Sequence, residues 1–281
     1  METLLNPSIK ARLNIISKSP PHAILIVGGS VESNYLLSIE LASEILEIET
    51  EDFDSYPYKK VISSKDNKAI SIEEIADLQK FLTLKIASGK VTNRVAIING
   101  ANLMSLPAQN ALLKTLEEPP HKTVLILTTD NEESLISTII SRSTILRNIS
   151  PTSDQLKSYF KEYNEHEFNR AFAISSNDVV LLKSLLEDKQ HPLYLASDLT
   201  KKLLKGDKYE RLVLVDELSK DREMVDRVLF ILERMASTAL LTTTKGSDKW
   251  REILNNSLEA KSALKKNAQT KLVLINLMLS I

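Results

Sequence analysis

The sequence predicts an α/β domain built on a parallel β-sheet, followed by a region made only of helices. Three short segments are rich in Val, Ile and Leu and do not alternate with polar residues: 23–29, 94–100 and 123–129. Such runs are typical of strands covered on both faces, as in a parallel sheet. Helical patterns lie between them, which favours an α/β layer with right-handed crossovers. The second half of the chain shows no strand-like pattern.

Weaker signals complete the predicted α/β layer. Residues 58–64 are a further strand candidate. Residues 71–86 carry one apolar stripe at helical spacing, and Ser71 followed by Glu74 resembles a capping box. Another amphipathic helix precedes Pro119–Pro120 and has to end there, because two prolines cannot continue it.

The C-terminal part is expected to be helical throughout. Apolar residues recur at helical spacing, most clearly along residues 225–240. The pattern breaks near residue 190, which we interpret as a domain boundary. The predicted helices are 154–163, 178–188, 225–240, 249–264 and 267–281.

Composition limits the possible functions. The chain has 281 residues, with 36 basic and 37 acidic side chains and a net charge of −1, so strong autonomous binding of nucleic acid is not expected. It has no cysteine, which excludes disulfides and cysteine-ligated zinc. The four histidines lack metal-ligand spacing, and no metal site is expected. No run approaches the ~20 apolar residues of a membrane span, so we expect a cytoplasmic protein without a signal peptide.

The turn after the first predicted strand lies where a phosphate-binding loop would be. Such a loop needs G-x-x-x-x-G-K-[ST], in which the lysine reaches the phosphates and the hydroxyl holds Mg²⁺. Gly28 matches the first glycine, but Ser33 replaces the second, Asn34 the lysine and Tyr35 the small hydroxyl residue. A tight turn that leaves the strand is therefore the favoured interpretation.

The second apolar run lacks the acidic end that would help to hold Mg²⁺. It ends in Asn99 and Gly100, neither of which supplies a negative charge. The lysine and hydroxyl of the phosphate-binding loop and the Mg²⁺-binding carboxylate of an ATPase site are therefore all absent. We therefore expect lost hydrolysis and no bound nucleotide cofactor.

One block of the sequence resembles the bacterial clamp-loader family of AAA+ ATPases. The specific elements, all within residues 94–143, are "AQNALLKTLEEPP", the following "VLILTT", and "TIISRS". The last resembles the family's Ser-Arg-Cys motif, with Ser143 in place of cysteine. Weaker similarity extends over most of the chain, and residues 258–279 resemble the C-terminal helices of delta-prime-type subunits.

The resemblance implies a P-loop NTPase-like AAA+ domain (1–150), a small helical lid (151–189) and an all-α collar for oligomerisation (190–281). It also implies a non-catalytic, delta-prime-like subunit without ATPase activity of its own. Its Ser-Arg motif, Ser141 and Arg142, would present an arginine finger to the ATP of a neighbour. The implied partners are gamma/tau-type ATPase and delta-type subunits. The sliding clamp would be an indirect partner, primed DNA would be reached through the complex, and no membrane is involved.

Departures from the family pattern also indicate that the chain does not bind ATP. The chain has no four-cysteine zinc module, and residues 173–184 show no arginine at the place where relatives often carry a nucleotide-sensing one. Glu117 and Glu118 are expected to form a helix terminus rather than to act as general bases. Two alternatives stay open: an active motor ATPase, and an AAA+-derived binding module outside the replisome.

Overall fold

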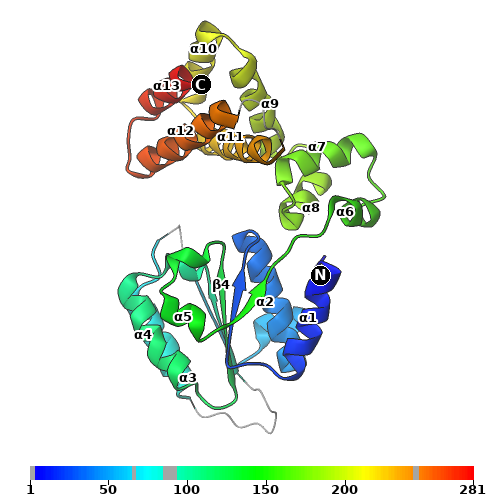
Figure 1. Cartoon of the computed structure of the whole chain (residues 1–281), viewed down its shortest axis with the longest axis vertical. Helices are drawn as coiled ribbons and strands as arrows, with labels where there is room; N and C mark the ends of the chain where they lie inside the picture. The colour runs from blue at the N-terminus through cyan, green and yellow to red at the C-terminus, as the bar shows by residue number, and fades with distance from the viewer. Residues whose placement is uncertain (1–3, 65–67, 85–93, 243–246) are drawn as a thin grey trace. The chain divides into compact units, whose positions relative to one another are not determined.

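The computed structural model describes residues 4–64, 68–84, 94–242 and 247–281. The chain divides into two compact units, shown in Figure 1. The first comprises Met1–Ser158 with Asp178–Val180, and the second comprises Tyr159–Asn177 with Leu181–Ile281. The finer division into an AAA+ domain, a lid and a collar stays a prediction.

The first unit contains a five-stranded parallel sheet in the order β2-β3-β4-β1-β5. All four predicted strands are confirmed. The fifth, at the edge beside β1, contradicts our expectation that the second half holds no strand. This strand is short and only Leu146 in it is buried, so it lacks the long apolar run from which the other strands were predicted. The strands are β1 (Ala23–Val27), β2 (Lys59–Ser63), β3 (Arg94–Asn99), β4 (Thr123–Thr129) and β5 (Thr144–Arg147).

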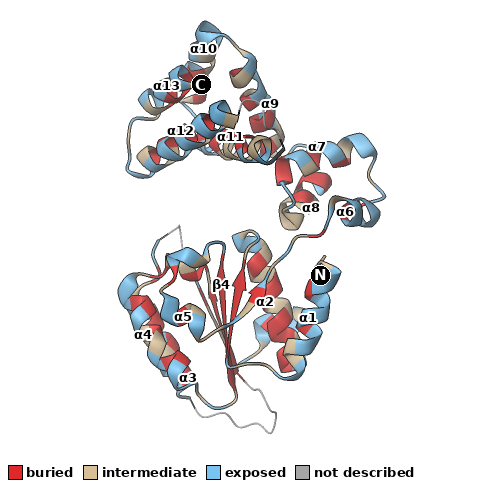
Figure 2. Ribbon diagram, in the orientation of Figure 1, coloured by how far each residue is buried: buried red, intermediate tan, exposed pale blue. Residues whose placement is uncertain are grey.

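Helices cover both faces of this sheet, which explains why its central strands β1 and β4 are buried along their whole length (Figure 2). One face packs against α1 (Pro7–Lys18), α2 (Val31–Leu46) and the 3-10 helix η1 (Thr50–Ser55). The core on this face includes Leu37 and Leu41 of α2.

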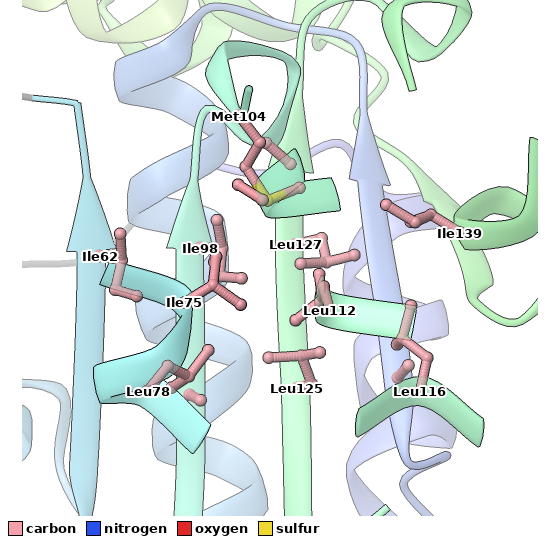
Figure 3. Close-up of a cluster of buried hydrophobic side chains, with 14 of the residues drawn as sticks. Ile62, Ile75, Leu78, Ile98, Met104, Leu112, Leu116, Leu125, Leu127 and Ile139 are labelled. Atoms are coloured by element: carbon pink, nitrogen blue, oxygen red, sulfur yellow. The ribbon is translucent and has the colours of Figure 1, made fainter. Parts of the chain in front are cut away.

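The other face packs against α3 (Ile72–Leu82), α4 (Leu106–Glu117) and α5 (Ser137–Ser141). Figure 3 shows Ile75 and Leu78 of α3, Leu112 and Leu116 of α4, and Ile139 of α5 against the strands.

Local signals place the ends of these helices as the sequence indicates. Ser71 and Glu74 form both hydrogen bonds of the capping box of α3. The helix before Pro119–Pro120 ends at Glu117. Residues 85 and 86, where the apolar stripe of α3 was predicted to continue, lie outside the described residues. Short 3-10 turns, η2 (Ala101–Leu103) and η3 (Glu132–Ser134), follow β3 and β4.

The remaining chain is helical, as predicted, and the long continuous segment of the first unit ends within α6. Arginines join helices of the second unit to one another. Arg211 donates to the backbone oxygens of Leu203 (2.8 Å) and Met278 (3.4 Å), and Arg234 donates to that of Ile174 (3.3 Å). A cation near the free carbonyls of a helix C-terminus is favourable. The helices are α6 (Ser153–Tyr159), α7 (Glu165–Ser175), α8 (Val179–Glu187), α9 (Pro192–Lys205), α10 (Lys208–Leu218), α11 (Arg222–Thr242), α12 (Ser247–Lys265) and α13 (Thr270–Ser280).

Among the helices that the structure describes, none combines the length and the apolar character that crossing a bilayer requires.

Candidate functional site

The parallel sheet gathers the degenerate positions at one edge. Since β1, β3 and β4 are adjacent and run in the same direction, their carboxyl ends meet there. The turn after β1 begins at Gly28, and β3 ends at Asn99. Thr128 and Thr129 are the last residues of β4, which lies between β1 and β3. This is the edge at which open α/β sheets bind ligands.

The turn after β1 has the tight geometry that the sequence predicts. Gly28 has a φ of +92° and Gly29 a φ of +69°, a left-handed region that favours glycine. The backbone N–H of Gly28 donates to the carbonyl oxygen of Thr129 at 3.1 Å. A Cβ on Gly29 would lie 2.7 Å from Nδ2 of Asn148, so this position is also closed sterically.

A closed polar network fills the turn. Asn34, at the lysine position, is fully buried. Its Nδ2 donates to the Thr129 carbonyl at 3.2 Å, and its Oδ1 accepts from Nδ2 of Asn148 at 2.8 Å. The same Asn148 nitrogen also donates to Oγ of Ser33 at 3.1 Å. Asn148 is anchored in turn, because its N–H donates to the Val27 carbonyl at 2.8 Å. The amide side chains thus satisfy one another inside the protein.

Part of the first turn of α2 is also hydrogen-bonded within the chain. Ser30 caps the helix, because its Oγ accepts from the N–H of Ser33 at 3.1 Å. Tyr35, at the position of the Mg²⁺-binding hydroxyl, is partly buried. Burial, helped by the charge of Asp54, raises the pKa of Tyr35 above its usual value, so this phenol stays neutral.

The end of β3 forms a neutral network of its own. Oγ1 of Thr128 donates to Oδ1 of Asn99 at 2.7 Å and accepts from the N–H of Gly100 at 3.0 Å. Gly100 has a φ of +76°, which a side chain would strain. These two positions therefore offer an amide and a backbone turn where an ATPase needs a carboxylate.

Arg142 lies directly after α5 and is partly exposed. Its Nη2 lies 2.8 Å from Oε1 of Glu117, the last residue of α4, and its Nη1 donates to the carbonyl of Thr138 at 3.3 Å. The exposed fractions of the two side chains are 36% for Arg142 and 52% for Glu117. Ser141, the other residue of the motif, is exposed, and its Oγ donates to the same carbonyl at 3.2 Å. The pairing of Arg142 with Glu117 was not predicted from the sequence. The opposite charges of the two residues were the only signal for it.

The structure does not bring Arg142 and the degenerate turn together. α5 packs through Ile139 on one face of the sheet, whereas α2, which carries Asn34, packs on the other. The guanidinium is therefore not directed to the turn of its own domain.

A basic cluster near the C-terminus consists of Lys261, Lys265, Lys266 and Lys271. From the sequence, a solvated helix face is favoured over a contact with phosphate. Two of them are engaged in ion pairs: Lys261 with Glu233 at 2.9 Å and Lys271 with Asp216 at 2.5 Å. Lys265 and Lys266 are exposed. The interpretation of this cluster as a solvated helix face stays a prediction.

Similarity to known proteins concentrates in the sheet domain. The family model described as "DNA polymerase III, delta subunit" matches residues 9–151, half of the chain. The tau subunit of DNA polymerase III from Bacillus subtilis is 44% identical over 71 residues, which are 25% of this chain and 12% of the relative. The delta' subunit of DNA polymerase III from Haemophilus influenzae is 31% identical over 102 residues, 36% of this chain and 30% of the relative. The chain thus matches less than a third of the length of either relative.

Solved structures extend the similarity in fold to the whole chain. A DNA polymerase III gamma-subunit-related protein from Thermotoga maritima superposes with a TM-score of 0.63 at 21% identity, covering 96% of this chain and 97% of that one. The RuvB Holliday junction branch migration motor of the same organism gives a TM-score of 0.51 at 14% identity, covering 85% and 76%. The fold is therefore an α/β AAA+ domain with a helical C-terminal region, as predicted.

Proposed function

The chain belongs to the DNA polymerase III delta-subunit family, and we propose that within it the chain is a non-catalytic, delta-prime-like subunit of a clamp loader. In this proposal it hydrolyses no ATP itself. It supplies Arg142 as an arginine finger to the ATP of an adjacent subunit, with Ser141 beside it in the motif.

One contrast within the sheet domain carries the proposal. At the position where an ATPase needs lysine, Asn34 is buried and bonded to Asn148 and Thr129. Arg142, by contrast, keeps a partly exposed guanidinium on the opposite face of the sheet from α2. A cation that cannot serve its own domain can still stabilise the charge that develops on phosphate in a neighbour.

The proposed partners are gamma/tau-type ATPase and delta-type subunits, with the sliding clamp and primed DNA engaged through the complex. The helical region 190–281 would be the collar that joins the ring, and 151–189 the lid. An apolar face on α10 supports a subunit contact there: Tyr209 is 76% exposed and Val213 is 48% exposed. Both residues line a groove of about 570 Å³ together with Lys201 and Lys205 of α9.

The test is ATP turnover in a complex reconstituted with the partner ATPase, delta-type subunit, clamp and primed DNA. Arginine fingers contribute on the order of 10³–10⁵ in rate to one active site. Arg142→Ala should therefore abolish the turnover of the site that it faces, while the sites served by other subunits persist. Arg142→Lys should not restore this turnover, because an ammonium lacks the planar fork of donors. Unchanged turnover with Arg142→Ala would overturn the proposal.

The absence of intrinsic ATPase activity needs a separate measurement. The isolated chain should show no ATP hydrolysis, and calorimetric titration with ATP and Mg²⁺ should show no micromolar binding. Micromolar binding would instead favour the motor-ATPase alternative. Purification of the chain from cells tests the other alternative, since a binding module outside the replisome would bring no clamp-loader subunits with it.

A further inference from the structure

We propose that Glu117 is a positioning residue, which holds the guanidinium of Arg142 in the orientation that a neighbour's phosphate meets. This inference rests on the proposed function of Arg142. Its starting point is the ion pair between the ends of α4 and α5, with 2.8 Å between Nη2 of Arg142 and Oε1 of Glu117.

The two contacts of the guanidinium leave part of it free to act. A guanidinium has five N–H donors in a rigid plane. The described hydrogen bonds use one N–H of Nη2 for Glu117 and one of Nη1 for the Thr138 carbonyl. Two bonds from different nitrogens fix the plane, while the side chain keeps an exposed fraction of 36%. The remaining donors can reach another acceptor without breaking either contact.

The backbone that carries the Glu117 carboxylate is held in place by packing. Leu112 and Leu116 anchor α4 in the core. Gln79 of α3 donates to the Ala111 carbonyl at 2.8 Å and to Oγ1 of Thr115 at 3.2 Å, so α3 and α4 are joined by hydrogen bonds as well. Glu117 ends this helix, and the next prolines prevent any extension of it.

The guanidinium is anchored from its own side through α5. Ile139 is fully buried in the same core cluster as Leu112 and Leu116. Since the backbones of Arg142 and Glu117 are both held by this cluster, their contact joins two side chains on one rigid support. Such support reduces the orientational freedom that an arginine loses when it meets phosphate.

The ion pair is too exposed to matter much for folding. Exposed pairs shift an equilibrium by about fivefold at most. A contact of this strength restricts a flexible side chain without preventing its exchange. We therefore expect its loss to lower the turnover of the neighbouring site by roughly two- to fivefold, well below the effect of removing the arginine itself.

The chain offers a matched control in the adjacent glutamate. Glu118 is also exposed, and none of the described hydrogen bonds joins it to Arg142. The reconstituted complex should be assayed with Glu117→Ala, Glu117→Gln and Glu118→Ala, measuring kcat and KM for ATP. We expect Glu117→Ala to lower kcat with little change in KM, because the guanidinium loses its orientation. Glu117→Gln should recover most of the rate, because its amide oxygen can accept the same N–H, and Glu118→Ala should match the unchanged chain.

A double variant separates this role from general damage. In the Arg142→Ala background, Glu117→Ala should lower the turnover no further, because there is no guanidinium left to position. An equal loss in Glu117→Ala and Glu118→Ala would overturn the inference, and so would a gain in turnover with Glu117→Ala, which would make the pair a restraint. Either result leaves the arginine-finger proposal standing as long as Arg142→Ala alone is impaired.

Discussion

Polar residues of one domain are buried in the turn after β1 but partly exposed at the end of α5. In the turn, Asn34 is fully buried and bonded to Thr129 and Asn148. After α5, Arg142 is partly exposed and bonded through only part of its guanidinium. The polar groups of the first region face one another, whereas those of the second remain available to solvent. The lysine position has thus become part of the packed interior, and the arginine has stayed at the surface.

A second arginine shows what a purely structural guanidinium looks like in this fold. Arg94 has an exposed fraction of 2% and donates to the carbonyls of Leu82 and Leu84 at the end of α3. It also lies over the ring of Phe81, 5.3 Å from its centroid. Burial lowers the pKa of Arg94 below its usual value. Like Arg94, Arg142 donates a hydrogen bond to a helix carbonyl, but Arg142 is not buried. Exposure therefore distinguishes the two arginines.

The largest effect expected from this comparison follows from restoring the lysine. Asn34→Lys places an ammonium in a fully buried site whose neighbours are amides and a carbonyl. An unpaired buried charge costs about 3–5 kcal/mol, and lysine would lower this cost only by losing its proton. We expect a loss of this size in the stability of the sheet domain, without recovered ATP binding.

The measurement has to separate the two units, since a chain with two units need not unfold in one step. Hydrogen exchange of peptides from β1 and α2 in increasing urea reports the sheet domain, while fluorescence of Trp250, the single tryptophan, reports the helical unit. Asn110→Lys, at an exposed position of α4, is the matched control. If Asn34→Lys were as stable as this control and bound ATP, the comparison would be broken.

A smaller effect is expected from removing the residue that fills the turn. Asn148→Ala removes the donor to Oδ1 of Asn34 and to Oγ of Ser33. A buried acceptor left without a partner costs about 1–3 kcal/mol. The same exchange measurement should show this loss in β1 and α2, with Asn110→Ala as the control. Stability equal to that control would mean that the network does not hold the turn.

The sequence was sufficient for most of the sheet, because the buried strands carry continuous runs of Val, Ile and Leu and the capping box of α3 is local. It was insufficient for β5, in which only Leu146 is buried. A short edge strand owes its conformation to pairing with β1 rather than to its own residues. Pairing over long sequence distances cannot be seen in a local pattern.

The same limit applies to the candidate site. The positions of Gly28, Asn34 and Asn99 could be located from their spacing after the apolar runs. The role of Asn148 could not, because it lies 114 residues from Asn34 and reaches it only through the pairing of β5. Glu117 was correctly expected at a helix terminus, but its contact with Arg142 depends on how α4 and α5 pack.

The smallest effect concerns the stability of the free chain without Arg142. Arg142→Ala removes an ion pair between side chains that are 36% and 52% exposed, and such pairs contribute about 0–1 kcal/mol. The Thr138 carbonyl loses one donor but still accepts from Oγ of Ser141, and it belongs to an exposed residue, where water can replace the lost contact. Hydrogen exchange of α4 and α5 in urea should therefore match that of Asn110→Ala. A loss as large as that of Asn148→Ala would place Arg142 with Arg94 among the structural arginines, and a fall in complex turnover would then reflect damage to the fold. Unchanged stability together with lost turnover is the combination that only a guanidinium acting outside its own domain produces.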